Sequence, residues 1–160
     1  MTLTVVEGDL LDQPVEVIVN AWNRNVFPWW LLLPQGVSGA IRRRAGTAPF
    51  RELRRFGWIP LGGAVRTGAG RLPFHAIVHV AGIDLMWRSS ERAVRGSAQS
   101  AMANAIAHGD RSIAFPLIGA GTGGRRRDLA QRWLCEELAT IPFDGEVRVV
   151  IWPERKAGGA

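Results

Sequence analysis

The sequence has little cysteine. Cys135 is the single cysteine, so it cannot form an intramolecular disulfide or one half of a Cys-x-x-Cys metal or redox pair. A chain without internal disulfides is typical of a reducing compartment. The first nine residues also lack the basic and apolar regions of a signal peptide. These absences predict a cytoplasmic protein.

Long hydrophobic runs are absent too. The longest one, Val26–Leu33, contains Pro28 and is far shorter than the roughly 20 residues that a membrane-spanning helix needs. We therefore expect no membrane partner. The chain also has no internal repeat, low-complexity linker or block of like charges that would separate a second domain. We predict one domain over residues 1–155 and a short tail over residues 156–160.

Lysine is nearly missing, although the chain is basic. Lys156 is the only lysine, so the net charge of +6 comes almost entirely from arginine. A basic surface favours anionic partners, and arginine suits flat, bidentate contacts with phosphate. Nucleic acid is an alternative partner that charge alone supports, and we do not expect it to be the main one. Its binding would depend steeply on salt.

Short apolar runs alternate with helical patterns, which predicts an α/β fold. The predicted strands are 3–8, 15–21, 63–69, 74–82, 112–119 and 146–152, and the predicted helices are 36–45, 48–56, 89–108 and 125–139. The helix over 89–108 has the clearest pattern, because five apolar residues keep helical spacing: Val94, Ala98, Ala101, Met102 and Ala105. A serine precedes this helix and Gly109 follows it. Gly96 weakens it by roughly 1 kcal/mol relative to alanine.

A glycine-rich segment, Gly119–Gly124, follows an apolar strand and precedes a helix. Glycines let backbone N–H groups approach a ligand, and the helix end adds partial positive charge. This arrangement suits a pyrophosphate, and a flexible turn without a ligand is the alternative. The segment is not a Walker loop, because no Gly-Lys-Ser/Thr follows it. It also lacks the position and the acidic partner of a Rossmann fingerprint.

Polar side chains follow the first two predicted strands. Asp9, in "EGDLL", can accept a hydrogen bond from a ligand amino group such as adenine N6, or it can cap a turn. Asn20, Asn23 and Asn25 end the second strand, where ligands bind in α/β sheets. Asparagine both donates and accepts, which suits a pair of ribose hydroxyls. For Asn20 and Asn25, bracing the loop is an equal alternative.

The other chemically active residues are interpreted as structural. His79 and His75 belong to a buried strand, where a histidine is more often a satisfied core residue than a catalyst. His108 resembles a helix-end cation, and Cys135 lies beside apolar helix positions. The arginines at 125–127 are mostly helix surface beside the glycine-rich segment. No group of His, Cys, Asp or Glu has the sequence spacing of a metal site, so we expect no metal and no cofactor.

Taken in order, these segments resemble a macrodomain. The macrodomain pattern begins with Gly-Asp-Ile/Leu after the first strand and continues with Val-Asn-Ala-x-Asn and a glycine-rich helix start. A strand ending in His-x-x-Gly and a Phe-Pro-x-Ile-x-x-Gly-x-x-Gly loop complete it. The matching segments are Gly8–Leu10, "IVNAWN" (Ile18–Asn23), "GVSGAI" (Gly36–Ile41), "HVAG" (His79–Gly82) and "FPLIGAGTGG" (Phe115–Gly124). The resemblance covers residues 5–152 and implies a three-layer α/β/α fold with a mixed sheet and a cleft for ADP-ribose.

The resemblance also implies a role for each matching residue. Asp9 would bind adenine N6, and Leu10 would offer a backbone contact. Asn23 would hold the distal ribose, with Asn20 supporting the loop. Trp152 would stack on adenine. The pyrophosphate and the distal ribose would be wrapped by Gly36, Val37, Ser38, Gly119, Ala120, Gly121, Thr122, Gly123 and Gly124.

One departure from the family pattern bears on catalysis. Hydrolytic macrodomains of the MacroD-like branch have a run of glycines before Val-Asp-Gly. The aspartate of that motif is often assigned the role of positioning or activating the attacking water. Here the run is "WWLLLPQG", and Ser38 stands at the aspartate position. A serine cannot act as a general base at neutral pH without help.

The resemblance implies that the chain binds ADP-ribose and ADP-ribosylated proteins and removes mono-ADP-ribose from acidic side chains. Water would attack C1 of the distal ribose, with Asn23 and Ser38 at the reaction centre and the ligand's own phosphate holding the water. A non-catalytic ADP-ribose reader, which Ser38 supports, is one alternative. An O-acetyl-ADP-ribose deacetylase that uses the same cleft is another.

Overall fold

The structure is a computed structural model that describes residues 1–23, 36–83, 90–119 and 124–153. Within these ranges the strands are β1 (Thr2–Glu7), β2 (Val17–Asn23), β3 (Ala64–Thr67), β4 (Ala76–Ile83), β5 (Ser112–Pro116) and β6 (Glu146–Ile151). The α-helices are α1 (Gly36–Ala45), α2 (Ala48–Arg55), α3 (Glu91–Ala107) and α4 (Gly124–Thr140). This order is the predicted one. The 3₁₀ turn η1 (Leu10–Asp12) was not predicted, and the apolar run Val26–Leu33 and the tail lie outside the described residues.

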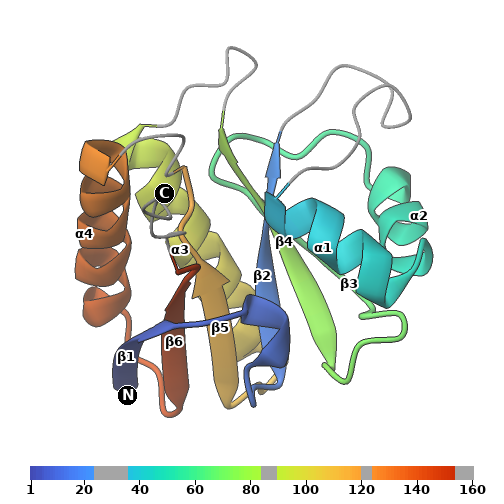
Figure 1. Ribbon diagram of the computed structural model, residues 1–160, viewed down its shortest axis with the longest axis horizontal. Helices are drawn as coiled ribbons and strands as arrows, with labels where there is room; N and C mark the ends of the chain where they lie inside the picture. The colour runs from blue at the N-terminus through green and yellow to red at the C-terminus, as the bar shows by residue number, and fades with distance from the viewer. Residues whose placement is uncertain (24–35, 84–89, 120–123, 154–160) are drawn as a thin grey trace, which may run out of the picture.

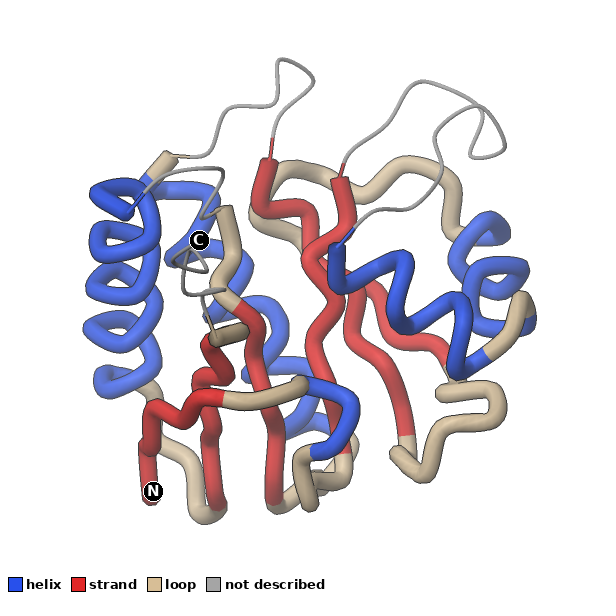
Figure 2. Tube along the Cα trace, viewed as in Figure 1, coloured by secondary structure: helices blue, strands red, loops and turns tan. Residues whose placement is uncertain are grey.

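The strands form one mixed sheet in the order β1-β6-β5-β2-β4-β3. Every neighbouring pair is parallel except β3 and β4, which are antiparallel. Figure 2 shows the sheet between its two helical layers. The predicted mixed α/β sheet is therefore confirmed.

Alternate residues of the central strands face opposite layers, as the pleat of a strand requires. Four valines of β2 and β4 pack with residues of α3 and α4: Val17, Val19, Val78 and Val80. Their neighbours Ile18 and Ile77 belong to a second core with Ile41 and Ala45 of α1. Both faces of these strands are thus covered, which explains their nearly continuous apolar sequence.

The most periodic segment of the sequence forms α3. Its five predicted inward side chains have no exposed surface: Val94, Ala98, Ala101, Met102 and Ala105. The helix begins at Glu91 because the Ser90 hydroxyl accepts a 3.1 Å hydrogen bond from Ala93 N–H. Ser89, where the prediction started, lies outside the described residues. Among the described helices, none is long and apolar enough to cross a membrane.

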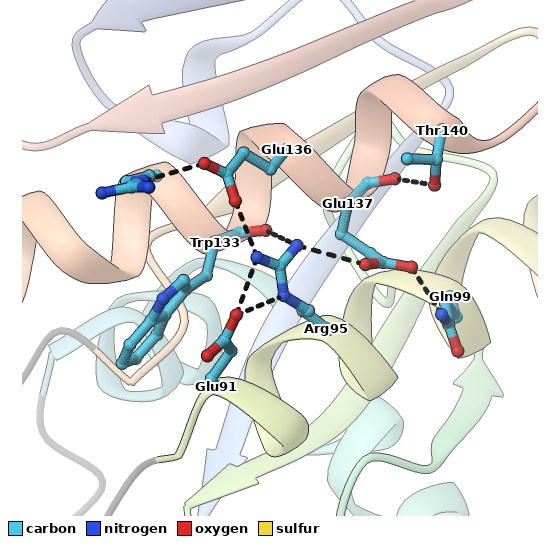
Figure 3. Close-up of polar contacts among 8 residues, drawn as sticks. Glu91, Arg95, Gln99, Trp133, Glu136, Glu137 and Thr140 are labelled. Carbon is cyan, nitrogen blue, oxygen red and sulfur yellow. Dashed lines mark hydrogen bonds and ion pairs between the residues drawn. The ribbon is translucent and has the colours of Figure 1, made fainter.

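Arg95 of α3 ties this helix to α4 (Figure 3). Its guanidinium contacts Glu91 one turn earlier and Glu136 across the helix pair, both at under 3 Å, and reaches Glu137 at 3.3 Å. Contacts with these carboxylates, Glu136 first, raise the pKa of Arg95. Arg132 and then Arg95 lower the pKa of Glu136. The cation therefore joins the two helices that cover one face of the sheet.

Candidate functional site

Several of the predicted ligand-binding residues lie at one edge of the sheet. Because β1, β6, β5, β2 and β4 are mutually parallel, their carboxyl ends share an edge. Asp9 closely follows β1, Asn23 ends β2, Gly119 closely follows β5 and Trp152 directly follows β6. Residues from both ends of the chain are therefore gathered where α/β sheets bind ligands.

β2 and β5 stop pairing before they reach this edge. In the described residues, β2 pairs with β5 only at Val17 and Ile18, whereas it pairs with β4 as far as Asn23. After β2 the chain forms α1, and after β5 it forms α4, which pack in different cores. Strands that separate and lead to opposite layers mark a topological switch point, which is the usual ligand crevice of such sheets.

Two helix N-termini follow the strands that meet at this crevice. α1 begins at Gly36 and α4 at Gly124, and neither helix has an acidic residue in its first turn. The N–H groups of a first turn have no partner within their own helix, so these positive helix ends are not neutralised from within the helix. Gly119 has φ +70°, a conformation that favours glycine. This arrangement suits a phosphate or pyrophosphate.

Asp9 caps the turn that follows β1. Its Oδ1 accepts a 2.9 Å hydrogen bond from Leu11 N–H, so the capping interpretation of Asp9 is confirmed. The other oxygen lies 3.7 Å from a guanidinium nitrogen of Arg44. The carboxylate keeps partial exposure and can accept a further hydrogen bond. The side chain of Leu10 is buried in the core, which leaves its backbone as the part that can face a ligand.

Ser38 is connected to the sheet through Asn20. The Ser38 hydroxyl donates a 2.8 Å hydrogen bond to Asn20 Oδ1, and Asn20 Nδ2 lies 3.0 Å from His79 Nδ1. Asn20 and His79 are both completely buried. Burial lowers the pKa of His79 to about 3, so its ring is neutral at physiological pH. Asn20 therefore braces α1 rather than facing the crevice, and His79 is a satisfied core histidine.

The sequence pattern alone does not reveal the hydrogen bond between Asn20 and His79. They are register partners across β2 and β4. The signal was a polar residue in the middle of each of two otherwise apolar strands. Their shared face becomes evident only once the two strands are known to be neighbours.

Trp152 lies at the same edge, directly after β6. Its side chain is 65% exposed, and its carbonyl accepts a 3.1 Å hydrogen bond from Arg127 of α4. An exposed indole on an ordered backbone offers a flat surface for stacking. Arg127, predicted as helix surface, holds that backbone in place.

Part of the predicted site lies outside the described residues: Asn25, Ala120, Gly121, Thr122 and Gly123. Asn23 is described as the last residue of β2, but its side chain is not. Gly36 and Gly124 are described as the first residues of α1 and α4, and Val37 packs against the core beneath α1.

Two further groups of polar residues lie away from this edge. A cavity of about 610 Å³ lies beside α3, lined by Leu61, Gly62 and several residues of α3 that include Arg95. At the opposite edge of the sheet, Glu16, His75 and Asp110 bring their ligand atoms within 4.8 Å of one another. Sequence spacing did not reveal this cluster. Asp110 is already bound by Arg66 through both oxygens, at 2.6 and 3.3 Å, and this neighbouring cation opposes a metal ion.

Comparison with known proteins shows the family of this chain. The family model described as "Macro domain" matches residues 19–134. The chain belongs to the Macro domain family. This macrodomain is 40% identical over 159 residues to the "Macro domain-containing protein in non 5'region" of Streptomyces griseus, covering 92% of this chain and 86% of the relative. It is 39% identical over 134 residues to a protein of Citrobacter rodentium named O-acetyl-ADP-ribose deacetylase, covering 79% and 72%.

A solved structure with the same fold is the Oceanobacillus iheyensis macrodomain with ADP. It superposes on this macrodomain with a TM-score of 0.77 at 27% identity, covering 92% of this chain and 82% of the other. A mutant of the same protein with ADPR has a TM-score of 0.71 at 28% identity, covering 94% and 85%.

Proposed function

We propose that this macrodomain binds ADP-ribose along the carboxyl edge of its sheet and hydrolyses mono-ADP-ribose from acidic side chains of modified proteins. The proposal rests on the gathering of Asp9, Ser38, Gly119 and Trp152 at one edge, next to two helix N-termini that have no acidic residue in their first turns. The names of the relatives support the ligand, since one is an O-acetyl-ADP-ribose deacetylase and another was solved with ADP.

Each part of ADP-ribose has a matching group at this edge. The Asp9 oxygen that does not cap the turn, Oδ2, accepts from adenine N6. Trp152 stacks on the ring, a contact worth roughly 1–3 kcal/mol by analogy with bases on aromatic platforms. The N–H groups at the starts of α1 and α4 bind the pyrophosphate. The distal ribose then lies at the end of β2, near Asn23 and Ser38.

The reaction is the hydrolysis of an ester at the distal ribose. The oxygen of a water molecule forms a bond to C1, and the bond between C1 and the carboxylate oxygen breaks. The carboxylate leaves as an anion, and the water proton passes to a ligand phosphate oxygen and then to solvent. Free ADP-ribose and an unmodified acidic side chain result. Orientation of water and sugar supplies the rate enhancement, because Ser38 is not a base at neutral pH.

Two alternatives use the same edge. The uncharged Ser38 favours a reader that binds ADP-ribose without turnover. The name of the Citrobacter relative favours deacetylation of O-acetyl-ADP-ribose.

Binding and turnover need separate measurements. Calorimetry with ADP-ribose tests the site, and absence of binding at high protein concentration would overturn the proposal. Release of labelled ADP-ribose from a glutamate-modified protein tests the reaction. Tight binding without release above the buffer rate would favour the reader. Release of acetate from O-acetyl-ADP-ribose, with no release of ADP-ribose from the modified protein, would favour the deacetylase. A weak dependence of affinity on salt would exclude nucleic-acid-like binding.

Asn23→Ala tests the reaction centre in the proposed hydrolase. Loss of a group that orients the ribose costs about a hundredfold in turnover, as for a small misplacement of reacting groups. The thermal unfolding midpoint of the variant, compared with that of the wild type, separates this loss from misfolding.

A further inference from the structure

Four side chains form one hydrogen-bonded line from α1 through the sheet to β3. Beyond the Ser38–Asn20 and Asn20–His79 contacts, His79 Nε2 lies 2.8 Å from Thr67 Oγ1, and that hydroxyl donates to Gly68 O at 3.0 Å. Thr67 is 3% exposed and Asn20 and His79 have no exposed surface, so the line is buried between Ser38 and Gly68, the residue that follows β3. Buried polar groups of this kind stay in place because each one satisfies the next.

The chemistry of each group determines which partner donates and which accepts at each hydrogen bond of the line. The Asn20 NH₂ group can only donate, so His79 Nδ1 accepts. The single proton of the neutral ring is then on Nε2, and it is donated to Thr67, whose own proton goes to Gly68 O. At the other end, Asn20 Oδ1 accepts the Ser38 proton. Ser38 is left with only its oxygen lone pairs for a ligand.

We propose that Thr67, His79 and Asn20 are positioning residues that hold the Ser38 hydroxyl as a fixed hydrogen-bond acceptor at the first turn of α1. The group that Ser38 meets must then be a donor, either the attacking water or a ribose hydroxyl. The kinetic part of this inference rests on the proposed hydrolase function, whereas the arrangement of protons does not.

The alternative arrangement of protons would reverse the role of Ser38. A proton on His79 Nδ1 would face the Asn20 NH₂ group, and the amide would have to turn over. Its nitrogen would then donate to Ser38, which would free the serine proton and make Ser38 a donor to the ligand. The described surroundings of His79 include Phe50, whose ring packs edge-on with centroids 6.0 Å apart. Burial lowers the pKa of His79 to about 3, which disfavours an imidazolium. Thr67 therefore decides the tautomer by accepting from Nε2.

Nuclear magnetic resonance of the imidazole nitrogens tests the proton arrangement directly. The chain has only three histidines, and His75, with 64% of its side chain exposed, provides a reference signal. We expect His79 to show the pattern of a neutral ring protonated on Nε2 from pH 7 to pH 5. A ring protonated on Nδ1, or on both nitrogens, would overturn the inference. Thr67→Val should weaken this tautomer preference, and Thr67→Ser should keep it.

Kinetics test the consequence for Ser38. Thr67→Val keeps the shape of the side chain but removes the acceptor, and we expect kcat to fall about tenfold with KM changed less than twofold, by analogy with outer-shell partners in metal sites. Thr67→Ser should restore kcat. Ser38→Ala should cause a similar loss, and the two changes together should cost little more than either alone, because one acts through the other.

The outcomes separate this inference from the proposed function. The positioning role would be overturned if the kcat losses of Thr67→Val and Ser38→Ala multiplied in the double variant. It would also be overturned if Thr67→Val lowered the melting temperature but left kcat unchanged. If the wild type releases no ADP-ribose, the proposed hydrolase fails. The nitrogen spectra then decide the proton arrangement on their own.

Discussion

A Cβ atom on Gly96 would lie 3.4 Å from the Cα atom of Gly62, so the middle of α3 packs directly on the backbone that precedes β3. One turn further along α3, the Ser100 hydroxyl donates a 2.7 Å hydrogen bond to Gly62 O. The sequence alone indicated only that Gly96 weakens the helix. A Cβ at this position would only make ordinary van der Waals contact with the Gly62 backbone, so the packing of helix on loop does not itself require a glycine at position 96.

The two glycines should respond differently to alanine. Gly62 has φ +78°, so Gly62→Ala should lower the free energy of unfolding by about 1–2 kcal/mol, the cost of a left-handed backbone for a residue with a Cβ. Gly96→Ala is the matched control, since its Cβ would make ordinary contacts and gain about 1 kcal/mol of helix propensity. Urea unfolding measures both. Equal stabilities of the two variants would contradict this account of Gly62.

Ser97 offers a stabilising substitution next to this contact. Within the part of the chain that the structure describes, its buried hydroxyl has no hydrogen-bond partner. Removing an unsatisfied buried hydroxyl should raise the free energy of unfolding by about 1 kcal/mol in Ser97→Ala. Ser100→Ala, which deletes the bond to Gly62 O, should lower it by about the same amount. A destabilised Ser97→Ala in the same denaturation series would show that its hydroxyl has a partner.

Local patterns predicted most of the fold because they depend on neighbouring residues. The helical spacing of Val94, Ala98 and Met102 was enough to predict α3, and an apolar run was enough to predict β4. Boundaries were less exact where a single side chain decides them. Ser90, for example, caps α3 by binding one backbone N–H, and Asp9 nucleates η1 in the same way.

The contacts that define the site join residues far apart in sequence. The sequence indicated Asn20, Ser38 and His79 as separate features, and only the pairing of β2 with β4 and the packing of α1 place them in one line. Glu16, His75 and Asp110 approach one another for the same reason, since each lies next to the start of a neighbouring strand. A single sequence contains no direct record of strand order, so such clusters could not be predicted from spacing.

His79 should make stability depend on pH. Its pKa is lowered to about 3 by burial, whereas the unfolded chain takes up the proton near pH 6.5. Between these values the unfolded state binds more protons, so the free energy of unfolding falls as the pH drops below about 6.5. Between pH 7 and pH 5 this group should remove about 2 kcal/mol of stability.

His79→Gln isolates this contribution. Glutamine cannot take up a proton, while the carboxylates contribute equally to both proteins. Unfolding in urea at pH 7 and pH 5 should therefore give a pH-dependent loss that is about 2 kcal/mol smaller for His79→Gln than for the wild type. The same loss in both proteins would mean that the histidine is protonated in the folded state.

Trp152 and Trp58 provide a matched pair for the proposed adenine end of the site. Both are exposed, at 65% and 49%, but Trp152 follows β6 at the candidate edge, whereas Trp58 follows α2, which packs beside β3 at the other end of the sheet order. Trp152→Ala should weaken ADP-ribose binding by about 1–3 kcal/mol, and Trp152→Phe should keep most of it, because stacking needs a flat ring. The backbone bond from Arg127 survives either change. Calorimetry should give Trp58→Ala the wild-type Kd. If Trp152→Ala also retains that Kd, adenine does not stack on this indole, and the ligand must be oriented differently along the edge.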